Sequence, residues 1–370
     1  MIENDLSRYI SDRMFDIPAE DWERLKSTHG RQELQDMFTD IICDGQIDFP
    51  KRTVTRQEAL EKQKKLMRFS NPPKDGACYF RHSDEVGRMY FECGSQYNDV
   101  SNYYHQDSRL LCCTNTRPSP IEHWTNRAKV RDITGSLFTM KPKRVNLSAF
   151  IEAVRLRTYV ASQFKPGIAK GIYDFFNAER VVDPCSGWGD RLAGFFASPC
   201  TRSYFGVDPN TNLTEGYAMQ IADYSELAPG KEAVVVCGCA EDPGIPFPEC
   251  DLVFTSPPYF DKEHYSKDPG QSYMQYSNFN DWLDGFLFKV IKKSHGALVP
   301  GGRMCINIAN IESKGTVCDI CSSMVGFAKS IGFSYDGCMG IRINARPNSN
   351  VAEKEGTYCE PLYVFTKKTS

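Results

Sequence analysis

Four short polar segments of this 370-residue chain each follow directly on an apolar stretch. The first, residues 183–190, holds Gly187 and Gly189, which allow a tight turn and a close approach of the backbone to a ligand. In the second segment, Asp208 lies about 20 residues after the first glycine, a spacing that suits a carboxylate binding two ribose hydroxyls. The third segment contains Glu241 and Asp242, where a carboxylate can accept a hydrogen bond from an exocyclic adenine amine.

The fourth segment is Ser256-Pro257-Pro258-Tyr259, which follows the stretch 251–255 with its three apolar residues Leu252, Val253 and Phe254. Consecutive prolines have a fixed φ and no backbone donor, so they cannot lie in the middle of a sheet. The segment is therefore a rigid corner with a hydroxyl before it and an aromatic ring after it. An ordinary Pro-Pro turn after a strand is the alternative interpretation.

From about residue 145 onward, helix-like and strand-like patterns alternate along the chain. Helices are predicted over 146–164, 169–177, 191–198, 213–225, 282–298 and 316–332, the first with Asn146 as its N-cap. Strands are predicted over 180–184, 203–209, 232–240, 251–257, 301–311, 333–344 and 360–368. This order favours a mostly parallel α/β sheet with helices on both faces, whose last two strands are antiparallel neighbours. Ligands bind at the carboxyl ends of such strands, so the four polar segments should meet there.

Residues 1–142 are aromatic, polar and rich in turns, and they are predicted to form a separate, irregular N-terminal domain before a second domain over 143–370. Lys and Arg number 5 against 12 Asp and Glu over residues 1–50, but 7 against 2 over 51–70. The basic segment could track the phosphates of a nucleic acid, which would give this domain a role in target recognition. A solvated helix face is the other interpretation.

The composition is that of a globular protein, with 41% hydrophobic and 25% charged residues and a formal net charge of −3. No run of about 18 apolar residues predicts a membrane span, and the acidic N-terminus lacks the apolar core of a secretory signal. The 15 cysteines are therefore expected to be thiols of an intracellular protein, cytoplasmic or nuclear. The spacings of the following residues match no zinc finger, and no metal site is predicted: Cys78, His82, Cys93, His105, Cys112 and Cys113.

DPCSGWGDRL (183–192) followed by TSPPYF (255–260) resembles the amino-methyltransferases, which transfer a methyl group from S-adenosyl-L-methionine to an exocyclic amine. The resemblance covers roughly residues 143–370, and the spelling of the motifs is most similar to phage- and virus-encoded members. It implies the Rossmann-like seven-stranded sheet of these enzymes, S-adenosyl-L-methionine as cofactor and DNA as partner. The SPPY form is most associated with N4-cytosine DNA methylation, and N6-adenine enzymes also carry it.

The resemblance also assigns residues to the cofactor. The segment 164–176 matches the one that these enzymes place ahead of the glycine strand, with Lys165, Pro166 and Ile168 as candidates for the methionine part. The other candidates for cofactor binding are Asp183, Pro184, Cys185, Gly187, Gly189, Asp208, Glu241 and Asp242.

The catalytic candidates are Ser256, Pro257, Pro258 and Tyr259. An exocyclic amine is a poor nucleophile, so it must be held in line with the methyl group by acceptors aimed at its N–H groups. The Ser256 hydroxyl and the Pro257 carbonyl could supply these acceptors, and Tyr259 would stack on the base. The polar segment 261–282 would then be a lid over the base, or an ordinary surface loop.

Two other functions are compatible with the same motifs. Related motifs occur in RNA methyltransferases and in glutamine N-methyltransferases, so an RNA base or a protein glutamine is an alternative substrate. A catalytically silent subunit that binds nucleic acid for a partner is a second alternative, and the presence of all the motifs argues against it.

Overall fold

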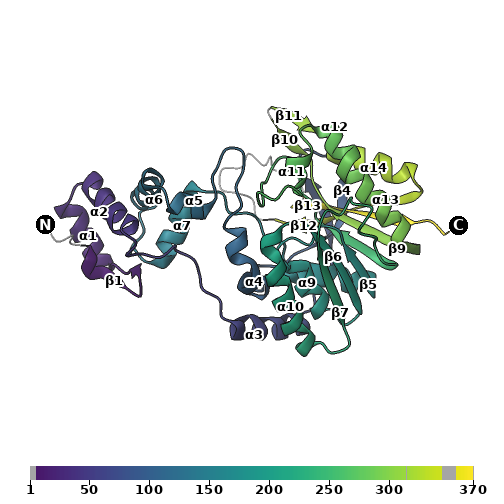
Figure 1. Cartoon of the computed structure of the whole chain (residues 1–370), viewed down its shortest axis with the longest axis horizontal. Helices are drawn as coiled ribbons and strands as arrows, with labels where there is room; N and C mark the ends of the chain where they lie inside the picture. The colour runs from purple at the N-terminus through teal and green to yellow at the C-terminus, as the bar shows by residue number, and fades with distance from the viewer. Residues whose placement is uncertain (1–5, 314, 344–355, 370) are drawn as a thin grey trace. The chain divides into compact units, whose positions relative to one another are not determined.

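The computed structural model describes residues 6–313, 315–343 and 356–369. The chain divides into two compact units (Figure 1). Met1–Thr53 and Asp107–Ala161 form the first unit, and Val54–Gln106 and Ser162–Ser370 form the second. Among the helices that the structure describes, none is long and apolar enough to cross a membrane.

The first unit is mainly helical. Its elements are a short turn Ser7–Tyr9, β1 (Ile10–Ser11), β2 (Met14–Phe15), α1 (Ala19–Thr28), α2 (Arg31–Cys43), α5 (Pro120–Trp124), α6 (Arg127–Met140) and α7 (Leu147–Arg157). Phe15, Trp22, Phe38 and Phe150 are buried together in its core. The side chain of Asn146 accepts a hydrogen bond from the Ala149 amide at the start of α7, which confirms it as the N-cap.

The second unit is built on one nine-stranded sheet in the order β12-β4-β3-β13-β9-β8-β5-β6-β7. The strands are β3 (Lys74–Phe80), β4 (Val86–Phe91), β5 (Arg180–Asp183), β6 (Ser203–Asp208), β7 (Glu232–Cys237), β8 (Cys250–Thr255), β9 (Leu298–Asn307), β12 (Phe333–Arg342) and β13 (Thr357–Lys367). Strands β9, β8, β5, β6 and β7 are parallel neighbours, and β13 runs antiparallel to both β9 and β12. The predicted parallel α/β sheet with a reversed terminal pair is confirmed.

Helices cover both faces of this sheet. They are α3 (Arg56–Arg68), α4 (Asp99–Arg109), α8 (Pro166–Phe176), α9 (Asp190–Ala197), a turn Thr211–Leu213, α10 (Thr214–Leu227), α11 (Ser272–Gln275), α12 (Phe279–Trp282), a π-helical turn Leu283–Leu287, α13 (Phe288–Ala297) and α14 (Ile320–Ser330). Figure 1 shows α9 and α10 on one face and α13 and α14 on the other. A small hairpin, β10 (Ile311–Ser313) with β11 (Thr316–Cys318), precedes α14.

The sheet has nine strands where seven were predicted, because the hairpin β3–β4 joins it. Strand β3 pairs with β13 and β4 pairs with β12, which closes β12, β13, β3 and β4 into a ring of paired strands. Cys78, Phe80 and Cys359 are buried inside this ring. The hairpin was missed because nine of its thirteen residues are exposed or only partly buried, so the sequence shows no regular apolar alternation there.

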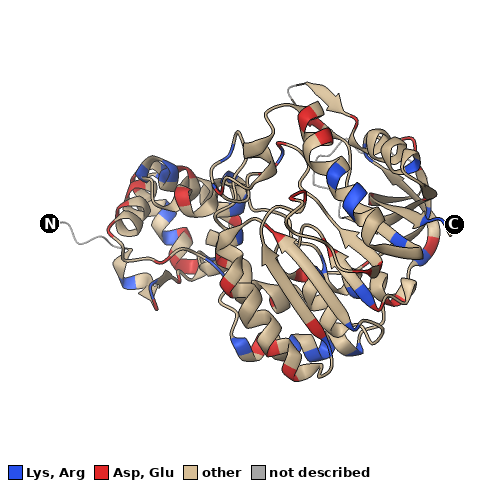
Figure 2. Ribbon diagram, turned by 45° about the vertical axis from the view of Figure 1, so that its right-hand side comes forward, with Lys and Arg blue, Asp and Glu red and all other residues tan. Residues whose placement is uncertain are grey.

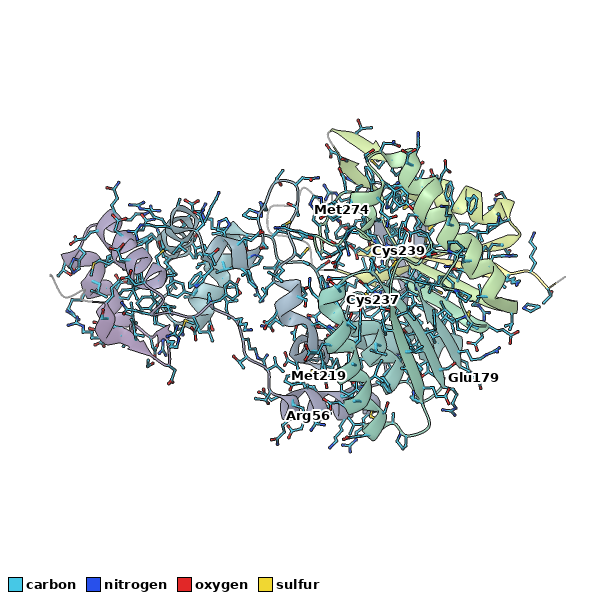
Figure 3. The ribbon with its side chains drawn as sticks, viewed as in Figure 1. Arg56, Glu179, Met219, Cys237, Cys239 and Met274 are labelled. Carbon is cyan, nitrogen blue, oxygen red and sulfur yellow. The ribbon has the colours of Figure 1, made fainter. Side chains whose placement is uncertain are left out.

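The predicted domain boundary at residue 142 also differs from the division in the structure. Residues 54–106 pack with the sheet, while 107–161, including α7, belong to the helical unit. The basic segment 51–70 contains α3, whose Arg56 is ion-paired to Asp223 of α10 at 2.7 Å (labelled Arg56 in Figure 3). Figure 2 shows basic and acidic residues interspersed along the helices of each unit, as expected from the small net charge.

Candidate active site

The glycine loop follows β5 and ends where α9 begins. Gly187 has φ +61° and Gly189 has φ +72°, a left-handed conformation that glycine adopts without strain. A Cβ added to Gly189 would lie 2.2 Å from the Gln220 side chain and 2.8 Å from His105, so the loop is packed too closely for any side chain there. The Gln220 amide donates to the Gly189 carbonyl at 2.9 Å. The backbone of the loop is thus held by α4 and α10 from behind.

Asp183 supports this loop from below. Its carboxylate is fully buried and accepts hydrogen bonds from Arg191 Nε and from the Tyr204 hydroxyl, both at 2.7 Å. Arg191 also donates to the Cys185 carbonyl. The sequence assigned Asp183 to cofactor binding, and the structure instead saturates its carboxylate inside the protein, so that it positions the loop.

Asp208, at the end of β6, faces the ligand side of the loop. Its carboxylate accepts from the Gly187 amide at 2.8 Å and from the Asn210 amide at 3.0 Å. Burial raises the pKa of Asp208 to about 6, although these two backbone donors act in the opposite direction. The carboxylate is therefore partly desolvated and retains lone pairs for further donors.

These strand ends surround a cavity of about 400 Å³, within the usual range for small-molecule sites. The predicted site residues that line it are Lys165, Pro184, Cys185, Gly187, Asp208, Glu241, Ser256, Pro257, Pro258 and Tyr259. Five do not line it: Pro166, Ile168, Asp183, Gly189 and Asp242. Pro166 and Ile168 are buried in α8, while Asp242 is exposed to solvent. The structure therefore does not bring these five positions to the cavity wall with the other ten, and their assignment to the cofactor stays a prediction.

Glu241 lies at the cavity next to the segment 261–282. The Tyr276 hydroxyl donates to its carboxylate at 3.3 Å, and burial raises the pKa of Glu241. Residues from the same segment that line the cavity are Lys262, Glu263, Tyr265, Gly270, Gln271 and Ser272. The Gln275 amide of α11 donates to the Cys239 thiol, which follows β7, at 3.3 Å. Cys239 and Met274, the residue before Gln275, are labelled in Figure 3. The segment thus covers the loop after β7, and its role as a lid stays a prediction.

The side-chain amide of Asn307 contacts Ser256, and the sequence analysis did not identify this residue. Asn307, at the end of β9, donates its Nδ2 to the Pro361 carbonyl at 3.0 Å. Because this carbonyl can only accept, the amide orientation is fixed, and Asn307 Oδ1 faces the Ser256 hydroxyl at 3.4 Å. Ser256 therefore donates its proton to Asn307. No local motif marks Asn307, because its position depends on the register of β8, β9 and β13.

Tyr259 and Phe260 complete the corner. The Lys262 ammonium lies 4.9 Å from the centre of the Tyr259 ring, within cation–π range. Phe260 has φ +51°, an unfavourable value for a bulky residue, and its ring packs against Phe279 at 5.8 Å and Trp282 at 6.0 Å. Packing of the aromatic rings holds the backbone in this conformation directly after the two prolines.

Across the described residues, no group of three or more His, Cys, Asp or Glu side chains is placed to hold a metal ion. Of the six candidates noted in the sequence, Cys112 and Cys113 belong to the helical unit and the other four to the sheet unit. His105 is buried against Gln220 at 3.1 Å, and burial lowers its pKa to about 4.

Residues 250–369, which include the Ser256 corner, match the family model described as DNA methylase. A curated relative, the Type II methyltransferase M.MjaVI of Methanocaldococcus jannaschii, is 31% identical over 91 residues, which cover 25% of this chain. The match spans only 44% of that relative's length. Together these matches confirm the resemblance to the amino-methyltransferases noted above.

Solved methyltransferase structures are similar to this chain at low scores. An rRNA methylase of Streptococcus thermophilus is 14% identical, with a TM-score of 0.35. The aligned region covers 57% of this chain and 100% of the chain of that methylase. An S-adenosylmethionine-dependent O-methyltransferase of Thermotoga maritima is 11% identical, covers 57% of this chain and 68% of its own, and has a TM-score of 0.36. These values are too low to support an inference about the substrate.

Asp208→Ala is expected to weaken S-adenosylmethionine binding by about 1.5–3 kcal/mol, because a charged acceptor is lost. In the wild type, affinity should fall as the pH is lowered through about 6, since protonated Asp208 accepts fewer hydrogen bonds. Calorimetry at pH 7.5 and pH 5 measures both effects. Asp208→Asn, which keeps one acceptor oxygen for the loop, should weaken binding and lose this pH dependence. Wild-type affinity in both variants would remove Asp208 from the cofactor site.

Proposed function

We propose that the protein transfers a methyl group from S-adenosylmethionine to the exocyclic amine of a DNA base, either N4 of cytosine or N6 of adenine. The observation that carries this proposal is that the Ser256 corner, within the DNA methylase match, opens into the same cavity as the glycine loop and Asp208. A methyl donor and an amine could therefore meet in one enclosed space.

The residues around the cavity fit the cofactor. Asp208 would accept from the ribose hydroxyls, and Glu241 would accept from the adenine amine. The α9 N-terminus and Lys165 supply positive potential for the methionine carboxylate. When bound, S-adenosylmethionine supplies the methyl group: the amine lone pair forms the new N–C bond, the electron pair of the broken C–S bond stays on sulfur, and one proton leaves the nitrogen.

Ser256 and Pro257 would orient the amine. Since the Ser256 proton is directed to Asn307, the hydroxyl oxygen is left to accept from an N–H group of the substrate. The Pro257 carbonyl can accept from the second N–H, and the prolines offer no competing donor. Two acceptors favour a pyramidal nitrogen and the positive charge that develops on it during transfer.

Tyr259 would provide the stacking surface for a base turned out of the duplex. Tyr259 lines the cavity, and its hydroxyl lies 3.5 Å from the Asn307 carbonyl. Contacts to the DNA backbone would come from exposed cations, and Lys64, Lys65 and Arg68 of α3 remain candidates for them. The role of the helical unit in target recognition likewise stays a proposal.

Mass spectrometry of nucleosides from cells expressing the protein tests the proposed function. N4-methylcytosine or N6-methyladenine should appear in the DNA and should be absent from cells expressing the Ser256→Ala, Tyr259→Ala double variant. A methylated base found only in RNA, or a methylated glutamine found only in protein, would replace the proposed substrate with that alternative. Unmodified DNA, RNA and protein would favour a silent nucleic-acid-binding subunit.

A further inference from the structure

Glu360 is an acidic side chain at the catalytic corner that neither the glycine motif nor the SPPY motif includes. It lies near the start of β13, next to Cys359, which is buried inside the ring formed by β12, β13, β3 and β4. Successive side chains of a strand point to opposite faces. Glu360 accordingly lies on the other face and lines the cavity together with Ser256, Tyr259 and Asn307.

The register of the sheet places Glu360 on the substrate side of the corner. Leu362 of β13 is opposite Asn307 of β9, and Thr255 of β8 is opposite Ile306 of β9. The cofactor candidates Asp208 and Glu241 follow β6 and β7, which lie beyond β8 and β5. The Ser256 corner thus separates Glu360 from the cofactor end of the cavity.

The carboxyl group of Glu360 makes no hydrogen bond or ion pair with any residue in the described part of the chain. Lys262 and Lys165 face it from the segment after β8 and from the start of α8, and both lower its pKa. Burial has the larger effect, and the pKa of Glu360 is raised overall. Arg342 of the neighbouring strand β12 is ion-paired to Glu92. Glu360 also faces the Tyr259 hydroxyl.

A half-buried carboxyl group with no partner among the described residues favours its neutral form more than a solvated one does, and the neutral form has one donor and one acceptor. Cytosine and adenine each place a ring nitrogen acceptor, N3 or N1, directly beside the exocyclic amine donor. A neutral carboxyl group can donate its proton to this ring nitrogen, whereas an ionised carboxylate would repel it. Guanine, which places two donors on that edge, would instead match the ionised carboxylate.

We infer that Glu360 reads the Watson–Crick edge of the target base, with its protonated carboxyl group donating to the ring nitrogen beside the amine. This inference rests on the proposed function and assigns its base specificity to one side chain. Glu360 would hold the base edge while Ser256 and Pro257 hold the amine. The ring nitrogen, by accepting this proton, would further favour the neutral form of Glu360 in the complex.

The experiment compares Glu360→Gln, Glu360→Ala and a matched control, Glu232→Gln, which alters an exposed residue at the start of the edge strand β7. The substrate is a synthetic duplex with the target sequence mapped from the methylated DNA. A second duplex carries 1-deazaadenine or 3-deazacytosine at the target position, which removes the ring nitrogen and keeps the amine.

Glu360→Ala should lower kcat/KM on the natural duplex about 10- to 100-fold, the usual cost of a lost base-edge contact. Glu360→Gln should retain most of the activity, because its amide also offers one donor and one acceptor. The wild type should lose activity as the pH rises above the raised pKa of Glu360, while Glu360→Gln should not. The deaza duplex should slow the wild type by a similar factor and should slow Glu360→Ala no further.

Wild-type activity in Glu360→Ala would overturn the inference, as would equal discrimination against the deaza base by the wild type and Glu360→Ala. Calorimetric affinity for S-adenosylmethionine should be unchanged in all three variants, which separates a lost base contact from a damaged fold. Failure of the proposed function is a different result: the wild type would then methylate no DNA base, and the nucleosides would show this before any variant is compared.

Discussion

Tyr259→Ala is expected to slow methyl transfer by one to two orders of magnitude while leaving S-adenosylmethionine affinity nearly intact. The reason is that Tyr259 is assigned to the base, and a stacked base typically contributes about 1–3 kcal/mol. Tyr259 lines the cavity together with Asn307 and Glu360. Single-turnover kinetics with the cofactor prebound measures the transfer step, and calorimetry measures cofactor binding.

Tyr259→Phe is the matched control, and it should retain much of the activity. The Tyr259 hydroxyl reaches the Asn307 carbonyl only at 3.5 Å, which is long for a hydrogen bond, so its removal should cost little. If Tyr259→Phe is as inactive as Tyr259→Ala, stacking is the wrong role for this residue. If both variants transfer at the wild-type rate, the SPPY segment is an ordinary turn and the proposed function is wrong.

Local patterns were sufficient to predict the parallel part of the sheet. Strands β5 and β6 are largely apolar runs that end at Asp183 and Asp208, and β8 leads directly into Ser256 and two prolines, so these signals come from adjacent positions in the sequence. The reversed pair β12–β13 followed from the absence of a helical pattern between them. Nine of the ten predicted residues that line the cavity lie at the carboxyl ends of parallel strands, which meet at one edge of the sheet, and the tenth, Lys165, came from the family resemblance.

Other features depend on contacts between distant segments, and the sequence alone does not show them. Asp183 looked like a cofactor ligand from its place in the glycine motif, but Arg191 and Tyr204, 8 and 21 positions further on, saturate its carboxylate. Asn307 and Glu360 reach the corner through the register of β13 with β9. Neither residue lies in a recognisable motif, so only the paired strands bring them to Ser256.

Arg191→Met is expected to destabilise the sheet unit by about 3–5 kcal/mol, because it leaves a buried carboxylate without its counter-charge. The side chains of Arg191 and Asp183 are 5% and 0% exposed, and they are joined by hydrogen bonds of 2.7 and 3.2 Å. Hydrogen exchange of β5 and β6 peptides in increasing urea measures the free energy of unfolding of the sheet unit separately from that of the helical unit.

The matched control is Arg180→Met, which breaks a surface ion pair with Glu249. The Arg180 side chain is 39% exposed and the Glu249 side chain is 70% exposed. That change should cost about 0–1 kcal/mol, since exposed ion pairs contribute little. Adding Asp183→Asn to Arg191→Met should recover part of the loss, because the uncompensated charge is then removed. If Arg191→Met costs no more than Arg180→Met, the buried pair does not hold the glycine loop. Asp183 would then be open to the role in cofactor binding that its motif first suggested.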